Sequence, residues 1–260
     1  MTKAVKTAGA APALVVVLVT AAALTLPAAV HAQRGGRGAG GGAATSARAS
    51  AAIDLTGYWV SVITEDWKYR MVTPKKGVFD AIPLSPEGRK IGQSWDPARD
   101  EAAGEQCKAY GAAGIMRMPT RLNITWENDN TLRIDTDAGT QTRRLYFGNA
   151  PAPGERSWQG HSTAEWESAG GRGAVRQGNL KVVTTNLRPG YVRRNGAPYS
   201  DRTTVTEFID VNTLPNGDRW MTVLTNVDDP VYLSRRYITT SDFKKLPDAT
   251  GWMPTPCSTK

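Results

Sequence analysis

The stretch "RLNITWENDNTLRIDTDAGTQTRRLYF", residues 121–147, decides the fold. Polar and apolar residues alternate along it, which places Leu122, Ile124 and Trp126 on one face of an extended segment. The tetrapeptides "ENDN" and "DAGT" interrupt this alternation with residues that favour turns. The stretch therefore predicts three consecutive antiparallel strands joined by short turns.

Similar alternating runs recur along the chain, whereas long helical periodicity is nearly absent. The runs at residues 203–211 and 219–227 are joined through Asn216 and Gly217. This pair is a strong hairpin signal, because both central residues of a tight two-residue turn take positive φ. Further strands are expected at "LTGYWVSVI" (55–63), "WKYRMV" (67–72), "STAEWE" (162–167), "LKVVTTN" (180–186), "TTVTEFIDV" (203–211) and "RWMTVLTNV" (219–227).

One segment, from Pro86 to Ala113, is expected to be helical, with Asp96 as the N-cap and Pro97 at the first helical position. The remaining pattern amounts to about nine or ten strands joined mostly by short loops. It argues for an all-β fold, an antiparallel meander that forms a barrel or a sandwich. Closure removes exposed strand edges, so we favour an antiparallel meander barrel with one short helical insertion.

The N-terminus, residues 1–32, has the pattern of a signal peptide. Lys3 and Lys6 precede an apolar run, and Ala32 ends a small-residue cleavage site. An uncleaved membrane anchor is the alternative, since the run from Ala8 to Val30 is long enough to span a bilayer, although two prolines interrupt it. We expect cleavage after Ala32, a periplasmic or secreted protein, and no transmembrane segment in the mature chain.

Residues 33–51 consist almost wholly of Gly, Ala, Arg and Ser and are expected to form a flexible tether, because they have too little apolar surface to fold. Five of the 32 basic residues of the chain precede Ala52, which leaves 27 against 24 acidic residues. That balance predicts no nucleic-acid partner, although Arg-Gly-Gly repeats can contact nucleic acid. Residues 52–260 are long enough for a single β-barrel domain with its own core.

Cys107 and Cys257 are the two cysteines of the chain. In an oxidising compartment an isolated pair is most simply a disulfide, which would hold the Pro-rich stretch "WMPTPC" on the body of the domain. Closing so long a loop contributes up to about 5 kcal/mol in the chain-entropy model. The alternative is a pair of buried free thiols. No C-x-x-C motif occurs, so a thioredoxin-type redox site is not expected.

The first expected strand contains the motif "DLTGYW", residues 54–59, in which Gly57 and Trp59 form a G-x-W pattern. In this motif the chain resembles the lipocalin and calycin superfamily. The resemblance implies a lipocalin-like barrel in which Trp59 closes one end and an arginine near the last strand, Arg235 or Arg236, stacks on the indole. A lipocalin barrel is shorter than this domain, and a second or third lipocalin motif is not evident.

A broader resemblance rests on "CKAYGAAGIMRMPTRLNITW", "DTDAGTQTR", "WQGHSTAEWE", "NLKVVTTNLRPGY", "NGAPYSD" and "DDPVYL". In these stretches the chain resembles a large group of exported bacterial proteins of unassigned function. The resemblance covers most of the domain and implies an exported β-domain. It implies no site residues.

His161 is the single histidine of the expected mature chain and the main acid–base candidate. The strand period of two places it on one face with Glu165, whereas Trp166 takes the other face. Glu165 lies roughly 13 Å along the strand, too far to orient the imidazole directly. Catalytic partners would come from neighbouring strands, with Asp135 and Tyr199 as candidates. The alternative is that His161 and its neighbouring glutamates simply face solvent.

Metal and cofactor sites are not predicted. A zinc or copper site usually needs several His or Cys ligands, whereas the expected mature chain has one histidine and its two cysteines are expected to form a disulfide. The sequence contains no G-x-S-x-G nucleophile motif, no P-loop and no G-x-G-x-x-G after an expected strand.

An excess of aromatic residues and arginines on or beside the expected strands points instead to a small-molecule pocket. Most of the tryptophans are expected to be core residues, but an arginine among them suits a carboxylate or phenolate, which it holds by paired hydrogen bonds. The residues concerned are Trp59, Trp67, Trp126, Trp158, Trp166, Trp220, Arg70, Arg121, Arg143 and Arg144. The candidate ligand-binding residues are Arg143, Arg121, Trp126, Trp166 and Tyr146.

Three functions stay open at this point. The first is a lipocalin-like protein that binds a small hydrophobic or aromatic ligand, with Arg143 or Arg121 holding any acidic group. The second is a cofactor-independent lyase, isomerase or hydratase, with His161 or Tyr199 as acid or base and Asp135 or Glu165 as its partner. Arg143 would then stabilise the developing negative charge. The third is a structural envelope protein. A pocket that holds His161 and Arg143 together would favour the enzyme, an aromatic lumen without His161 the binder, and a filled barrel the structural role.

Overall fold

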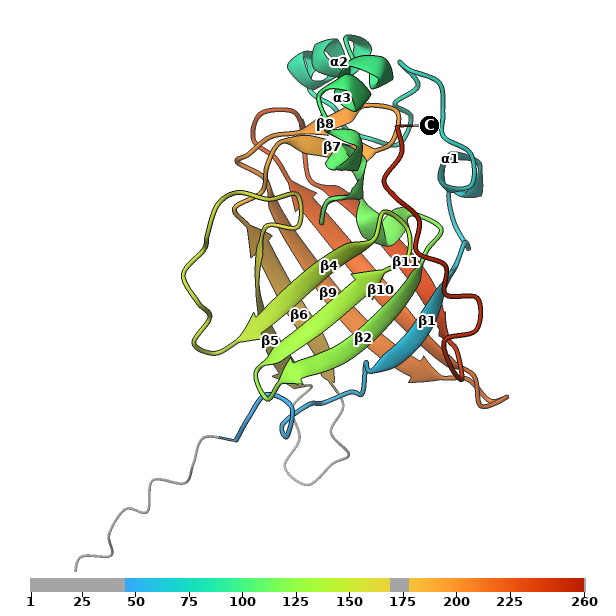
Figure 1. The fold of residues 1–260 in the computed structure, drawn as a ribbon, viewed down its shortest axis with the longest axis vertical. Helices are drawn as coiled ribbons and strands as arrows, with labels where there is room; N and C mark the ends of the chain where they lie inside the picture. The colour runs from blue at the N-terminus through green and yellow to red at the C-terminus, as the bar shows by residue number, and fades with distance from the viewer. Residues whose placement is uncertain (1–44, 169–177, 260) are drawn as a thin grey trace, which may run out of the picture. The chain divides into compact units, whose positions relative to one another are not determined.

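The alternating stretch at residues 121–147 forms three antiparallel strands, β2 (Arg121–Asn128), β3 (Thr131–Thr136) and β4 (Gln141–Phe147). They belong to a closed barrel of nine strands in a computed structural model that describes residues 45–168 and 178–259 (Figure 1). The predicted all-β barrel is confirmed and is compatible with a lipocalin-like barrel. The predicted signal peptide and residues 33–44 of the predicted tether lie outside the described residues.

The other barrel strands are β1 (Gly57–Val62), β5 (His161–Ser168), β6 (Gly178–Thr185), β9 (Thr204–Thr213), β10 (Arg219–Asp228) and β11 (Tyr237–Lys245). Around the barrel the order is β1-β2-β3-β4-β5-β6-β9-β10-β11, and β11 pairs with β1 to close it. Neighbouring strands are antiparallel except β4 and β5, which are parallel, with Leu145 beside Ser162. The connection at 148–160 returns the chain to the start of β5, as a parallel pair requires.

The prediction of a strand at residues 67–72 is wrong. Residues Trp67–Arg70 form a short helix, α1, instead of extending the sheet. Arg70 is buried and binds the Glu65 carboxylate and the carbonyl of Arg117. These tertiary contacts outweigh the β propensity of the aromatic residues beside Arg70.

The closing strand and one turn also differ from the sequence-based expectation. The sequence does not predict β11, because inward positions such as Ser241 and Lys245 break the apolar half of the alternation. The hairpin between β9 and β10 is confirmed, but its turn spans residues 214–218. Of its two predicted central residues, Gly217 alone takes a positive φ, 84°, so the turn is longer than the expected two-residue type.

The helical insertion predicted between Pro86 and Ala113 is confirmed. It consists of α2 (Pro86–Gln93), α3 (Pro97–Ala102) and the 3-10 turn η1 (Gln106–Tyr110). Asp96 caps α3 as predicted, accepting hydrogen bonds from the amides of Ala98 and Arg99 at 3.0 and 3.4 Å. No helix among the described residues is long and apolar enough to span a membrane.

A small separate hairpin, β7 (Gly190–Arg193) and β8 (Ala197–Tyr199), packs with this insertion. A second 3-10 turn, η2 (Ile115–Arg117), leads into β2. Figure 1 shows α2, α3, β7 and β8 gathered above one end of the barrel. We call this end of the barrel the capped end.

The core lies inside the barrel around Trp59, which is fully buried and donates its indole N–H to the Leu55 carbonyl at 2.8 Å. The Nζ atom of Lys245 lies 4.8 Å from the centroid of the Trp59 ring. Lys245 of β11 therefore supplies the cation that the lipocalin resemblance assigns to Arg235 or Arg236. Both arginines lie just before β11 and are exposed, so that assignment is corrected.

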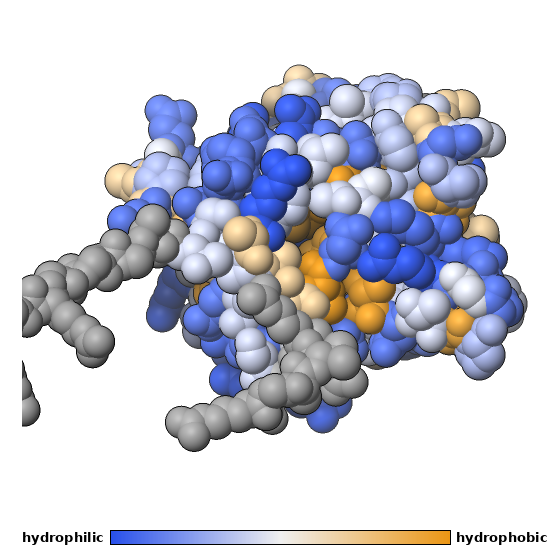
Figure 2. All heavy atoms as spheres, turned by 90° about the horizontal axis from the view of Figure 1, so that it is seen from below, coloured by the Kyte–Doolittle hydropathy of each residue, from blue (hydrophilic) through white to orange (hydrophobic). Residues whose placement is uncertain are grey.

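Aromatic residues gather at the end of the barrel opposite the capped end. The Phe147 ring centroid lies 5.5 Å from that of Trp126 and 5.4 Å from that of Trp166. The Ala47 carbonyl accepts a hydrogen bond from Trp166 Nε1 at 2.8 Å, so the last residues of the predicted tether contact the barrel. Figure 2 views the molecule from this side and shows apolar residues, in orange, among hydrophilic ones.

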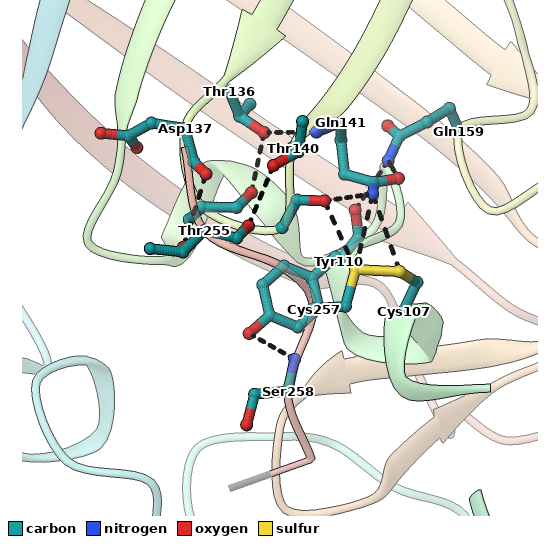
Figure 3. The surroundings of a disulfide bond; sticks show 12 residues. Cys107, Tyr110, Thr136, Asp137, Thr140, Gln141, Gln159, Thr255, Cys257 and Ser258 are labelled. Carbon is teal, nitrogen blue, oxygen red and sulfur yellow. Dashed lines mark hydrogen bonds between the residues drawn. A yellow bond between two sulfur atoms is a disulfide. The ribbon is translucent and has the colours of Figure 1, made fainter. Parts of the chain in front are cut away.

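The predicted disulfide is confirmed, since Cys107 and Cys257 are bonded (Figure 3). Nearby, the Thr255 amide donates to the Asp137 carbonyl at 2.9 Å. The Nε2 atom of Gln141 lies 3.5 Å from Cys257 Sγ. These contacts hold the stretch "WMPTPC" against the turn between β3 and β4.

Candidate functional site

The interior of the barrel is filled by side chains. Leu122, Leu145 and Val223 point inward and are fully buried. The predicted ligand residues Trp126 and Trp166 also pack against this core, at the end opposite the capped end. Because side chains fill the interior, the structure offers no support for a ligand site inside the described barrel.

Arg143 of β4 crosses this interior to an ion pair with Glu207 of β9. Its Nη2 lies 2.7 Å from Glu207 Oε2, and its Nη1 lies 3.2 Å from Oε1. Nη2 also donates to Thr184 Oγ1 at 3.1 Å, and the hydroxyls of Thr184 and Ser162 are 2.8 Å apart. Glu207 thus occupies the position that an anionic ligand would take on Arg143.

His161 lies on the outer face of the barrel, away from Arg143. Along β5, Ser162 points inward, whereas His161 and Glu165 point outward, in the grouping that the sequence predicts. The His161 ring stacks on the ring of Tyr146 with centroids 5.3 Å apart. The structure therefore brings two predicted site residues together and separates both from Arg143.

The imidazole of His161 lines an outer groove of about 640 Å³, part of which is open solvent. Asp135, on β3, accepts a hydrogen bond from the Thr142 hydroxyl at 2.5 Å. Glu165 pairs with Lys181 at 2.7 Å. Within the described residues neither carboxylate hydrogen-bonds to the imidazole, so a catalytic role for His161 stays a prediction.

Tyr199 and Arg121 lie apart from this groove. Tyr199 is fully buried on β8, and a Cβ added at Gly111 or Gly190 would come within 2.6 Å of its hydroxyl oxygen. Burial raises the pKa of Tyr199, so its phenol is protonated at neutral pH. Arg121 lies at the start of β2, with Nη1 3.8 Å from Asp137 Oδ2.

A cavity at the capped end has the features of a ligand site. The cavity itself is about 40 Å³, within about 500 Å³ of atom-free space that includes open solvent. Charged, aromatic and apolar side chains all line it, a combination typical of small-molecule pockets. We call it the arginine pocket. The residues that line it include Asp66, Tyr69, Arg70, Arg117, Arg193 and Tyr237.

Arg70 most directly indicates an anionic ligand. Its side chain is only 2% exposed. Nε donates to the Arg117 carbonyl at 2.9 Å, and Nη1 donates to Glu65 Oε1 at 2.7 Å. Nη2 is buried as well but has no hydrogen-bond partner among the described residues. Buried donors are normally satisfied. The Nε atoms of Arg121 and Arg143 are also buried without a partner among the described residues, but of these three arginines only Arg70 lines this cavity.

Arg117 binds the two carboxylates at the start of α1. Its Nη2 lies 2.8 Å from Asp66 Oδ2, and its Nη1 lies 3.6 Å from Glu65 Oε1. Asp66 has a left-handed backbone conformation, with φ at 51°, which is uncommon outside glycine. The residue with this strained backbone, Asp66, is also the one whose carboxylate binds Arg117 and so holds α1 against η2.

Arg193 has a different environment, because in the described part of the chain it binds no carboxylate. Its Nη2 donates to the Val78 carbonyl at 2.6 Å and its Nη1 to the Asp80 carbonyl at 3.2 Å. The guanidinium carbon lies 5.0 Å from the centroid of the Tyr69 ring. Carbonyl dipoles and a ring face compensate its charge less completely than an ionised carboxylate would.

The arginines of the pocket are poorly hydrated and repel one another. Burial lowers the pKa of Arg70, and the charge of Arg117 lowers it further, against the opposing effect of Glu65. Burial also lowers the pKa of Arg193, and Arg117 acts in the same direction. Guanidinium groups carry a positive charge in proteins, so the pocket attracts an anion.

Tyr237, the first residue of β11, supplies a neutral donor. Its side chain is buried, and among the described residues its hydroxyl has no hydrogen-bond partner. Burial raises the pKa of Tyr237, although Arg117 and Arg193 oppose the change. The phenol therefore stays protonated at neutral pH and can donate to an acceptor in the pocket.

The sequence interpretation did not select these residues as a site. Arg70 stood among the arginines near aromatic residues, but the run around it was assigned to a strand. The stretch "EDWKYR" contains a usable signal, because two carboxylates and an arginine within six residues can form a buried ion pair. Nothing in the sequence brings Arg117 and Arg193 to Arg70, since they come from separate segments.

In the described ranges no group of three or more His, Cys, Asp or Glu side chains is placed to hold a metal ion. Comparison of the chain with family models, curated proteins and solved structures found no match. The arginine pocket is therefore interpreted from its own chemistry.

Proposed function

We propose that the protein is an exported β-barrel that binds a small ligand with an acidic group and an apolar or aromatic part. The ligand binds in the arginine pocket at the capped end, outside the filled interior. The observation that carries the proposal is the buried Nη2 of Arg70, which has no acceptor among the described residues. A ligand oxygen would complete its hydrogen bonding.

A carboxylate suits the pocket better than a phosphate. The free donors that we identify are Arg70 Nη2 and the Tyr237 hydroxyl, which match the two oxygens of one carboxylate. A phosphate dianion would leave further acceptor oxygens without donors in a partly closed site. Met118 and Val192 also line the pocket and offer apolar surface for the rest of the ligand.

Export is part of this proposal. It rests on the signal-peptide pattern of residues 1–32. The disulfide between Cys107 and Cys257 supports it, because such bonds persist in oxidising compartments.

A structural envelope role is the second candidate, and the filled barrel interior favours it. The two candidates differ in a simple way. A structural protein needs no affinity for small carboxylates, whereas a binder loses its function without it.

Calorimetric titration and thermal unfolding with benzoate, phenylacetate and octanoate test the proposal. We expect at least one of these carboxylates to bind and to raise the melting temperature by mass action, and the neutral isostere benzamide to have no effect. If none binds, the structural role is favoured instead.

Two variants assign the binding to the pocket. Tyr237→Phe removes one hydroxyl, and Arg70→Lys keeps a charge beside Glu65 but removes the free Nη2. Each is expected to weaken binding by about fivefold to tenfold, which corresponds to one hydrogen bond of about 1 to 1.5 kcal/mol. Tyr146→Phe makes the same chemical change in the outer groove and should leave affinity unaltered. Equal affinity in all variants would contradict the assignment.

A further inference from the structure

We propose that the outer side of residues 66–76, here called the α1 segment, docks on the surface of an anionic lipid bilayer. The arginine pocket would then take its ligand from the membrane. The docking itself is independent of the proposed function, whereas the origin of the ligand rests on it.

The α1 segment has two chemically different sides. Tyr69, Arg70 and Thr73 line the arginine pocket. Trp67, Met71 and Val72 are 68, 55 and 68% exposed, respectively. Six large hydrophobic residues are exposed in the described part of the chain, and three of them lie in the short stretch from residue 67 to residue 72. Scattered exposed apolar residues are ordinary, but such a concentration indicates an interaction surface.

The same segment carries positive charge. Lys68, Lys75 and Lys76 are exposed, and no carboxylate of the described residues lies within ion-pair distance of them. The acidic residues of the same stretch, Glu65 and Asp66, are engaged by Arg70 and Arg117. Lys68 Nζ lies 4.7 Å from the centroid of the Tyr69 ring, and the three lysines give the segment a positive charge that no carboxylate of the described residues pairs with.

Tryptophan beside exposed lysines is the composition of a membrane-surface contact. Trp side chains favour the headgroup region, where the ring is partly buried and its N–H stays in contact with water. Lysines near the surface attract the anionic headgroups, and the attraction weakens with salt. Met71 and Val72 would enter the acyl boundary beside Trp67.

A second copy or another protein fits this surface less well. A stable protein interface buries about 800 Å² on each partner, far more than a group of three apolar side chains provides. Interfaces are also depleted in lysine, whereas the α1 segment contains three exposed lysines. A bilayer needs neither a large area nor shape complementarity.

The membrane contact would place the pocket at the water–lipid boundary. The residues that dock and the residues that line the pocket alternate within one short segment. An apolar compound with a carboxylate partitions into this boundary with its acidic group outward. Docking through α1 would therefore shorten the path of such a ligand to Arg70.

Quenching of tryptophan emission by brominated phosphatidylcholine provides a local test in the full chain. The vesicles contain the brominated lipid with phosphatidylglycerol, or the brominated lipid alone. We expect quenching with the anionic vesicles only, and its loss in Trp67→Phe, because Trp67 is the exposed tryptophan of the described residues. Equal quenching in Trp67→Phe would overturn the docking site, even if the chain binds vesicles through another segment.

Charge reversal tests the electrostatic part. Lys75→Glu with Lys76→Glu should reduce the quenching with anionic vesicles at least tenfold at moderate salt. The matched control is Arg89→Glu with Lys90→Glu, which changes the charge equally at two exposed positions of α2 and should have little effect. An equal loss in both double variants would show a response to net charge alone and would contradict docking through α1.

Two further measurements separate the possible failures. Sedimentation velocity without lipid should show no self-association that depends on Trp67, since such association would assign the surface to a second copy. Carboxylate binding in the absence of vesicles should be unchanged in the double lysine variant. Carboxylate binding without quenching removes the docking proposal only, and quenching without carboxylate binding removes the proposed function only.

Discussion

Two buried arginines of this protein differ in how their charge is compensated. Arg143, inside the barrel, forms two hydrogen bonds with Glu207 and a third with Thr184, and its buried Nε has no partner among the described residues. Arg70, at the capped end, shares the carboxylate of Glu65 with Arg117 and keeps one buried Nη2 without a partner among the described residues. Burial is similar in the two cases, with both side chains 2% exposed.

The difference lies in the supply of negative charge. The interior provides Arg143 with a carboxylate of its own, which completes the ion pair without a ligand. The capped end brings Arg70, Arg117 and Arg193 into one pocket, where Arg70 and Arg117 share Glu65 and Arg193 binds no carboxylate of the described residues. A buried arginine with a carboxylate of its own has its charge compensated within the fold, whereas an arginine that shares its carboxylate can also bind the anionic group of a ligand.

The largest effect is expected in the interior. Glu207→Gln leaves the buried charge of Arg143 without its counter-ion and should reduce the free energy of unfolding by about 3 to 5 kcal/mol. Urea denaturation of the purified variant measures the loss. The double variant Arg143→Met with Glu207→Leu should recover most of it, because it removes both charges. A single variant as stable as the original chain would show that the ion pair is not important for the fold.

Asp229 is a buried anion whose carboxylate accepts four hydrogen bonds from the protein, so its charge is stabilised without a counter-ion. Its carboxylate accepts the amides of Val231 and Tyr232 at 2.7 and 2.9 Å, the Thr203 hydroxyl at 2.5 Å, and the Ser200 amide. Burial opposes ionisation, but these hydrogen bonds outweigh it and hold the pKa of Asp229 below its ordinary value.

Because its pKa is depressed by folding, Asp229 contributes stability above its unfolded-state pKa of about 3.9, and the contribution is lost as the pH falls through the lower folded value. Asp229→Asn should therefore be less stable by about 1 to 3 kcal/mol at pH 7, and the difference should narrow below about pH 4. Thermal unfolding from pH 7 to pH 2 measures both. A difference that is constant with pH would contradict the depressed pKa.

Glu65→Gln provides the counterpart of Glu207→Gln at the capped end. Removing this partly exposed carboxylate should reduce stability by only about 1 kcal/mol. It should also strengthen benzoate binding, because Arg70 and Arg117 lose a competing anion. Added benzoate should therefore stabilise Glu65→Gln but not restore Glu207→Gln, whose arginine lies in the filled interior. Equal rescue of both variants by benzoate would remove the distinction between the two arginines.

The smallest effect is expected at an exposed pair on the outer face. Arg144 Nε lies 2.7 Å from Glu127 Oε2, with both side chains well exposed to solvent. Arg144→Gln should change the free energy of unfolding by less than about 0.5 kcal/mol and should leave carboxylate binding unchanged. A loss as large as that of Glu207→Gln would show that burial does not determine these effects.

The barrel could be predicted because its strands alternate clearly and its turns carry typical residues, as at residues 121–147. Periodicity groups residues by face but does not tell which face points inward, so the inward position of Arg143 and the outward position of His161 required the structure. The strand β11 could not be predicted because its inward residue Ser241 is polar and interrupts the apolar alternation.

The pocket was less accessible to sequence reasoning. Arg70, Arg117 and Tyr237 come from α1, η2 and β11, and they meet only after the barrel has closed. Their roles depend on which hydrogen bonds are left unmade, and a one-dimensional pattern does not contain that information.

A crystal structure with 4-bromobenzoate would show where a carboxylate binds. We expect an anomalous bromine peak in the arginine pocket, with a carboxylate oxygen accepting a hydrogen bond from Arg70 Nη2 and the bromine toward Met118 and Val192. A bromine peak elsewhere, or an Arg70 Nη2 bound to a protein atom with no ligand in the pocket, would contradict this expectation.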